Sequence, residues 1–106
     1  MIRKAFLIHA KEGMAGEYQK RHNSIWPEMK TALKTYGASN YSIFLHERTG
    51  ALFGYIEIED EGTFSGIGDT EVCQRWWKYM KEVLISESDE SPMAKEEILK
   101  EVFHLD

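Results

Sequence analysis

Two adjacent tryptophans, Trp76 and Trp77, are the most informative residues of this chain. They lie in the run Val-Cys-Gln-Arg-Trp-Trp-Lys-Tyr-Met at positions 72–80, which has the pattern of a helix. Consecutive helix positions point about 100° apart, so both rings cannot lie deep in one core. An indole offers a flat apolar face with an N–H at its edge, which suits a ring-shaped, hydroxylated ligand such as a sugar. The simpler interpretation places Trp76 in the core and Trp77 at an interface.

His22 is the candidate for proton transfer, because histidine both gives and takes protons near neutral pH. Tyr18 lies four residues earlier, and residues four apart are neighbours on a helix. Pro27 interrupts the helical pattern shortly afterwards and frees backbone groups nearby. Tyr41, at the start of a predicted strand, either leaves its hydroxyl in solvent or points it into the same cavity. A histidine on an apolar stripe is commonly a packed core residue, so the pattern alone leaves both interpretations open.

Metal binding is not expected from this sequence. The four histidines fall on four separate predicted elements, and none is paired with another at helical ligand spacing: they are His9, His22, His46 and His104. Cys73 is the only cysteine, which excludes an internal disulfide, and its apolar surroundings predict an inert packing residue. We therefore expect a protein without a metal site.

Composition limits the class of protein further. With 106 residues, 42% of them hydrophobic and 29% charged, residues 1–106 are expected to form one domain with a substantial core. The net charge of -5 argues against a nucleic-acid partner. No segment approaches the roughly 20 apolar residues of a membrane span, and the N-terminus lacks the features of a signal peptide. We therefore expect a cytoplasmic location and no membrane partner.

The periodicity of apolar residues predicts alternating strands and helices. Strands are expected at 2–10, 40–45, 52–59 and 102–105, with a hairpin turn at 47–50. Helices are expected at 17–36 and from about 70 to 84, with weak helical character from 96. The first helix should break between His22 and Pro27, with Ser24 capping the second piece, and should end at Gly37. Residues 60–69 are expected to be loosely structured, and the acidic segment 86–92, including the charge run 87–90, to be a solvated loop.

This order of elements is the ferredoxin-like β-α-β-β-α-β pattern of the α+β class. The predicted strands carry apolar residues on both faces, but helices can cover only one face of such a sheet. The other face would be a large apolar patch unless something covers it. A second copy, packed sheet against sheet, is the simplest solution, so we expect a symmetric homodimer.

Three segments together go beyond this general pattern: residues 1–6 (Met-Ile-Arg-Lys-Ala-Phe), residues 17–28 (Glu-Tyr-Gln-Lys-Arg-His-Asn-Ser-Ile-Trp-Pro-Glu) and residues 72–80. They closely resemble the corresponding parts of the L-rhamnose mutarotases, and the similarity runs nearly end to end, including 37–41 and 101–103. Residues 60–69 and 86–97 are the least similar to that family, and neither segment contains a site residue that the resemblance implies.

The resemblance implies a dimeric α/β barrel that interconverts the α and β anomers of L-rhamnopyranose without a cofactor. It implies that His22 is the proton donor and that four residues bind the sugar: Tyr18, Tyr41, Trp76 and Trp77. Opening the hemiacetal ring requires one proton delivered to the ring oxygen and one removed from the anomeric hydroxyl. A positioned histidine can supply one of these transfers. The second group is left open among a tyrosine, a water molecule and the same imidazole.

Two other functions are compatible with the same fold, because fold alone does not determine chemistry. One is a cofactor-free monooxygenase, which would consume oxygen with a quinol substrate. The other is a sugar-sensing dimeric module, which would bind its sugar tightly without accelerating anomer exchange.

Overall fold

The computed structural model describes residues 1–88, 90–91 and 93–106. Within these residues the elements follow in this order: β1 (Ile2–His9), α1 (Ala15–Asn23), α2 (Pro27–Thr35), β2 (Ala38–His46), β3 (Ala51–Ile58), α3 (Glu61–Ser65), the 3₁₀-helix η1 (Gly66–Asp69), α4 (Glu71–Met80) and β4 (Glu97–Leu99). None of these helices is long and apolar enough to cross a membrane.

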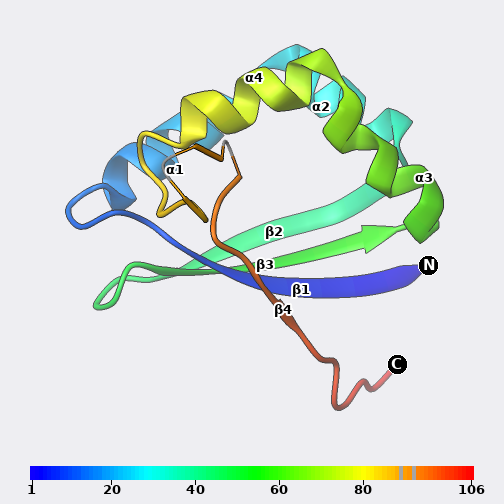
Figure 1. Cartoon of the computed structure of the whole chain (residues 1–106). Helices are drawn as coiled ribbons and strands as arrows, with labels where there is room; N and C mark the ends of the chain where they lie inside the picture. Colours follow the sequence, from blue (N-terminus) through cyan, green and yellow to red (C-terminus); the bar gives the residue numbers. More distant parts are fainter. Residues whose placement is uncertain (89, 92) are drawn as a thin grey trace.

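The strands form one antiparallel sheet in the order β2-β3-β1-β4. The helices all lie over one face of this sheet, and the segment after β4 runs away on the opposite side (Figure 1). The ferredoxin-like β-α-β-β-α-β prediction is confirmed. Each of the two helical connections is divided into shorter pieces, α1 and α2 in the first and α3, η1 and α4 in the second.

The break in the first helical connection lies where Pro27 predicts it. Pro27 occupies the first turn of α2, and Trp26 before it is extended, with φ −61° and ψ 135°, as expected for a residue that precedes proline. The prediction that Ser24 caps the second helix was wrong. Ser24 instead ends α1, where its N–H donates to the Lys20 carbonyl oxygen and the following Ile25 N–H donates to that of His22, and α2 begins without a side-chain cap.

The second helical connection is more ordered than the sequence suggested. Residues 60–69, expected to be loosely structured, form α3 and η1, because the Asp60 carboxylate caps α3 by accepting from the Thr63 N–H at 2.6 Å. Helix α4 is capped by Thr70, whose side chain accepts from the Cys73 N–H. Helix α4 ends at Met80 rather than near Leu84, since the chain turns there and Leu84 bridges to Ala10.

The C-terminal strand also differs from the prediction. The strand that pairs with β1 is Glu97–Leu99. The weak helix expected from 96 is therefore absent, and residues 102–105, expected to be the strand, form none. Val102 and Phe103 expose 86% and 79% of their surface. Their composition favours a strand, but strand propensity is realised only against a partner strand, and residues 97–99 already occupy the β1 edge. In the acidic segment 86–92, Glu87, Ser88 and Glu90 are exposed as expected, whereas Asp89 and Pro92 lie outside the described residues.

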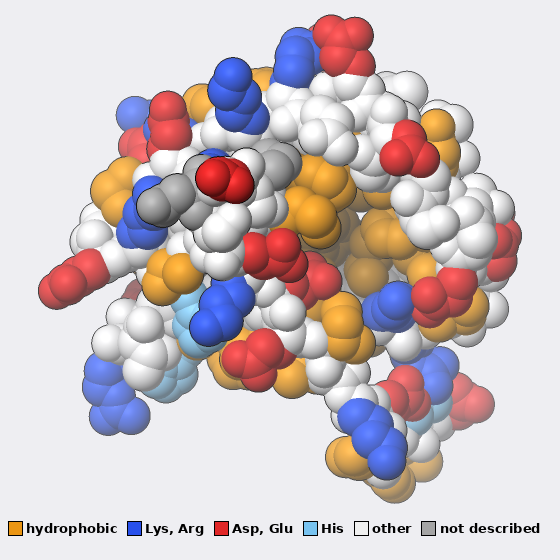
Figure 2. Space-filling model, viewed as in Figure 1, with side chains coloured by type: hydrophobic (Ala, Val, Ile, Leu, Met, Phe, Trp, Pro, Cys, Tyr) orange, Lys and Arg blue, Asp and Glu red, His pale blue; other side chains and the backbone are white. Residues whose placement is uncertain are grey.

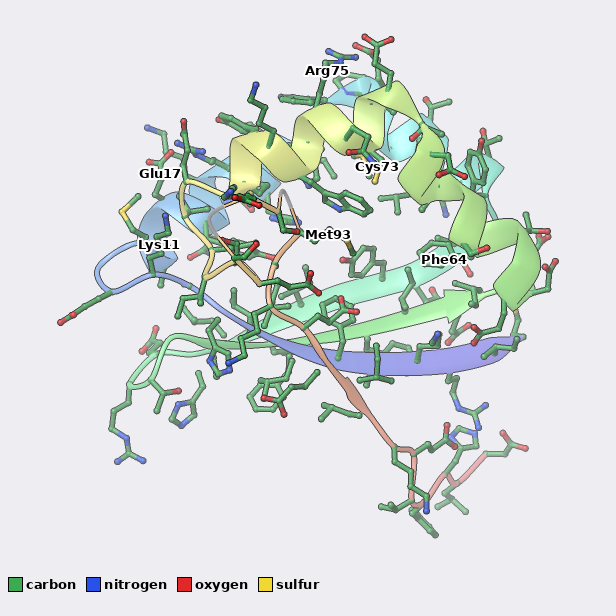
Figure 3. All side chains as sticks on the ribbon, in the orientation of Figure 1. Lys11, Glu17, Phe64, Cys73, Arg75 and Met93 are labelled. Carbon is green, nitrogen blue, oxygen red and sulfur yellow. The ribbon has the colours of Figure 1, made fainter. Side chains whose placement is uncertain are left out.

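The two faces of the sheet have different surroundings. The face under the helices is the core face, and Leu52, Ile56 and Ile58 are buried there. Figure 3 shows that Cys73 points from α4 toward this interior, whereas Arg75 points outward. On the face without helices, the cross-strand neighbours Phe44 and Phe53 expose 66% and 43% of their surface. We call these the covered face and the open face.

Candidate active site

A cavity of about 360 Å³ lies between the helices and the covered face, within the range of roughly 300–1,000 Å³ that is common for small-molecule sites. Figure 2 shows it as a hollow walled largely by hydrophobic side chains. The structure brings all five sequence-predicted site residues to this cavity: Tyr18, His22, Tyr41, Trp76 and Trp77. Tyr18, His22 and Tyr41 also line a wider groove along the edge strand β2. The cavity and the groove therefore share part of their lining.

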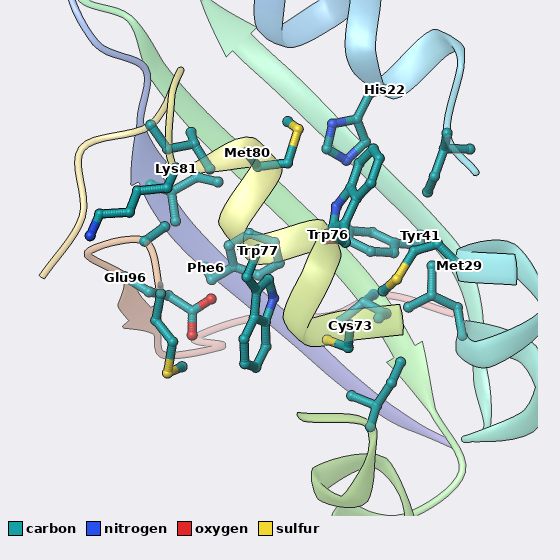
Figure 4. A pocket seen from close by; sticks show the side chains of 18 of the residues that line it. Phe6, His22, Met29, Tyr41, Cys73, Trp76, Trp77, Met80, Lys81 and Glu96 are labelled. Carbon is teal, nitrogen blue, oxygen red and sulfur yellow. The ribbon is translucent and has the colours of Figure 1, made fainter. Parts of the chain in front are cut away.

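Helices α1 and α4 together position the imidazole. Tyr18 and His22 are one turn apart on α1, and their ring centroids are 4.6 Å apart. Trp76 of α4 meets the His22 ring edge to face at 5.4 Å. Figure 4 shows His22, Trp76 and Tyr41 grouped at one end of the cavity. The sequence spacing predicted the Tyr18–His22 contact, whereas the contact between α1 and α4 exists only through the tertiary fold.

The His22 side chain is polar in a largely apolar environment. Its Nδ1 atom is buried and has no hydrogen-bond partner among the described residues. Burial lowers the pKa of His22 below its ordinary value, so the ring is neutral near pH 7. A buried polar atom without a partner is costly, and such atoms are uncommon in folded proteins. The atom is therefore suited to exchange a proton or a hydrogen bond with a molecule that enters the cavity.

Further aromatic rings, not among the predicted site residues, hold Trp76 in place. Trp26 meets Trp76 edge to face at 5.0 Å and stacks on Tyr79 at 5.5 Å. Arg21 lies over the Tyr79 ring at 4.1 Å and is paired with Glu17 at 2.8 Å. Trp76 is consequently 6% exposed while still lining the cavity, so it is both a core residue and a wall residue.

The two tyrosines present hydroxyl groups that stay protonated. Burial raises the pKa of both Tyr18 and Tyr41, so each is a neutral hydrogen-bonding group and a poor phenolate base. Tyr41 lies edge-on to Phe6 at 6.2 Å. Burial also raises the pKa of the Cys73 thiol to about 11, which keeps that side chain protonated at neutral pH.

The cavity also has charged wall residues that were not predicted from the sequence, Lys4 and Glu96 among them. Burial raises the pKa of Glu96, and the ammonium group of Lys4 opposes that shift. Lys4 was detectable in principle, because the period of two along β1 places it on the covered face together with Ile2, Phe6 and Ile8. Glu96 carried no comparable signal, since it precedes a strand whose position the sequence did not reveal. Across the described ranges, no three His, Cys, Asp or Glu side chains gather in a way that could hold a metal ion.

Comparison with known proteins places this geometry in a family. The family model described as L-rhamnose mutarotase matches residues 3–105. A protein of Opitutus terrae named L-rhamnose mutarotase is 52% identical over 106 residues, which is 100% of each chain. The crystal structure of an L-rhamnose mutarotase from Formosa agariphila matches with a TM-score of 0.88 at 29% identity and covers 100% of each chain.

A more distant structural neighbour is described as a putative antibiotic biosynthesis monooxygenase from Nitrosomonas europaea. It matches with a TM-score of 0.64 at 8% identity and covers 95% of this chain and 89% of its own. Similarity at that level shows a shared fold and carries no information about chemistry. The family match over residues 3–105 and the full-length relative do carry such information, and together they show that the chain belongs to the L-rhamnose mutarotase family.

Proposed function

We propose that residues 1–106 form one domain that, as a homodimer, interconverts the α and β anomers of L-rhamnopyranose. The proposal takes its substrate from the names of the relatives. The observation that carries it is the position of the His22 imidazole, which has an unpartnered Nδ1 and lines the same cavity as two indoles and two tyrosines.

The neutral imidazole fits the first step of ring opening. His22 takes the proton of the anomeric hydroxyl, the C1–O5 bond breaks, and the C1 carbonyl forms as the electron pair moves to the ring oxygen. The imidazolium then donates its proton to that oxygen, which is the proton-donor role that the family resemblance implies. After rotation about C1–C2, the reverse steps close the ring on the other face of the carbonyl. Because O1 and O5 are both bonded to C1, one imidazole can serve both transfers.

The aromatic residues supply binding. The flat faces of Trp76 and Trp77 suit the C–H face and the 6-methyl group of a deoxyhexose. Tyr18 and Tyr41, whose hydroxyls are protonated at neutral pH, can donate hydrogen bonds to sugar hydroxyls. The site thus combines apolar contact for the ring with a few polar groups that orient it, as small-molecule sites commonly do.

Replacing the imidazole tests the proposal. We expect His22→Ala to slow anomer exchange of L-rhamnose at least tenfold, because a positioned acid–base group contributes about 10²- to 10⁴-fold in rate. Saturation-transfer NMR between the two anomeric protons measures this exchange directly. His104→Ala is the matched control, since His104 is exposed, lines neither the cavity nor the groove, and is hydrogen-bonded to Asp106. Unchanged exchange in a folded His22→Ala protein would refute the assignment.

Anomer exchange by the unmodified protein tests one alternative function, and oxygen uptake tests the other. A sugar-sensing module would bind L-rhamnose without accelerating exchange in the unmodified protein. A monooxygenase would consume oxygen with a quinol, and the fold shared with such enzymes is compatible with that activity without favouring it.

The homodimer and the location are further parts of the proposal. The exposed apolar residues of the open face, Phe44 and Phe53 among them, support a second copy packed on that side. A cytoplasmic location stays a prediction of the sequence.

A further inference from the structure

Strand β2 contains one residue more than its partner strand at the position just before Tyr41. Ala38 pairs with Ile58 and Ser39 with Glu57, but the next pair is Ser42 with Tyr55. Asn40 and Tyr41 therefore lie opposite the single residue Ile56. This arrangement is a β-bulge, which bends a strand and re-aims the side chains that follow.

The extra residue decides on which face Tyr41 lies. Side chains of a strand alternate between faces, and a shift of one residue moves every following side chain to the other side. In unbroken register Tyr41 would lie opposite Tyr55 and therefore on the open face, where Tyr55 and Phe53 lie. With the bulge, Tyr41 lines the cavity, as Ile56 and Phe6 on the covered face do.

Asn40 has the properties that the bulge requires. Its φ is 46°, in the left-handed region that asparagine tolerates better than other residues with a side chain, apart from aspartate. Its Nδ2 donates to Glu57 Oε1 at 3.0 Å, and Glu57 Oε2 accepts from the Tyr55 hydroxyl at 2.8 Å. The bond from Asn40, followed by that from Tyr55, lowers the pKa of Glu57, so this carboxylate is ionised at neutral pH. The neighbouring strand thus holds the bulge from the open face.

We propose that Asn40 is a positioning residue that, by forming this bulge, places Tyr41 in the active-site cavity. The inference rests on the proposed function only for the role of Tyr41 in binding sugar. The position of Tyr41 itself follows from register and can be measured without any substrate.

Substitutions of Asn40 by residues that differ in their tolerance of positive φ test the proposal. Valine is β-branched and strongly disfavours positive φ, whereas glycine adopts it freely. We expect Asn40→Val to remove the NMR cross-peaks between the Phe6 and Tyr41 rings and to raise the KM for L-rhamnose about fivefold or more. Asn40→Gly should keep the cross-peaks and a KM within about twofold. Ser42→Val, the same replacement at a regularly paired and exposed position, should leave both unchanged.

A double variant separates positioning from general damage. If Asn40 acts through Tyr41, adding Tyr41→Phe to Asn40→Val should leave the KM at the Asn40→Val value, because the Tyr41 hydroxyl has already left the cavity, so the two effects will not add. Should Asn40→Val not fold, Asn40→Ala replaces it, since alanine is also strained at positive φ.

The outcomes distinguish this inference from the proposed function. Retained Phe6–Tyr41 cross-peaks in folded Asn40→Val protein would overturn the positioning role whatever the kinetics. Lost cross-peaks, together with an unchanged KM in Tyr41→Phe, would uphold the positioning of Tyr41 and refute its part in sugar binding.

Discussion

The covered and open faces of the sheet are built from the same strands but differ in how deeply their side chains are buried. Ile56 and Ile58 on the covered face expose 4% and 0% of their surface, whereas Phe53 on the open face exposes 43%. Both sets are apolar, so alternation along the strands does not separate a polar side from an apolar side. What separates them is the helical layer, which buries one face and encloses the candidate site there. The open face is left available for association.

The largest effect on the free energy of unfolding should come from Trp76, which belongs to the core and also lines the cavity. Trp76→Ala removes a ring that contacts His22, Trp26 and Tyr79, and we expect a loss of about 3–5 kcal/mol in the free energy of unfolding. Phe44→Ala on the open face should cost less than about 0.5 kcal/mol within the protomer. Urea denaturation at low protein concentration measures both. Equal losses would abolish the distinction between the faces.

A smaller effect is expected at Gly54, which lies beneath Phe6 on the covered face. A Cβ at this position would overlap the Phe6 ring, so we expect Gly54→Ala to displace that ring and to cost about 1–3 kcal/mol by overpacking. Gly16→Ala is the control. It lies in α1 with nothing near the added atom and should stabilise by about 0.5–1 kcal/mol. Thermal denaturation of the two variants should therefore shift in opposite directions.

The open face can be tested by its association. We expect Phe53→Asp to weaken self-association at least tenfold, or about 1.4 kcal/mol, because it places a charge in an apolar contact while leaving the core untouched. Sedimentation velocity over a range of concentrations measures the change, and Phe53→Leu should retain association. A Phe53→Asp protein that dimerises as tightly as the parent would show that the copies meet elsewhere.

The smallest expected effect is the contribution of His22 to the pH dependence of the free energy of unfolding. Because burial lowers the pKa of His22 in the folded chain, the unfolded chain binds more protons as the pH falls through the ordinary imidazole value of about 6.5. Stability should therefore be fully present above that value, decline as the pH falls through it, and level off below the folded pKa. His22→Gln should lose this component of the pH dependence in urea titrations. A parent protein that gains stability relative to His22→Gln on acidification would indicate a charged partner for the imidazole.

Local signals in the sequence were sufficient for much of the fold. Pro27 and Gly37 mark the boundaries of α2, and Gly50 at φ 79° ends the hairpin turn as predicted. These residues act through their own backbone preferences. Features that depend on a distant partner were missed. The bulge at Asn40 needs Glu57 of the neighbouring strand, and the true position of β4 depends on which residues reach the β1 edge.

The site residues divide in the same way, into those related by local spacing and those brought together only by the tertiary fold. The resemblance selected five residues that line one cavity, but spacing alone related only Tyr18 to His22. The roles assigned to the five stay predictions until the variants above are measured. The side chains that support Trp76 are far apart in the sequence, and no periodicity connects them: they are Arg21 of α1, Trp26 just before α2 and Tyr79 of α4.

The interruption of the first helix at Pro27 has one more consequence. Because α1 stops at Asn23, His22 lies in the final turn of a helix, where unsatisfied carbonyl groups create a partial negative charge that favours cations by about 0.3–1 kcal/mol. In the proposed reaction the positive imidazole would form at this helix end, where the peptide dipoles of α1 favour it. The proline that separates α1 from α2 thereby places His22 at the end of a helix whose dipole favours a cation.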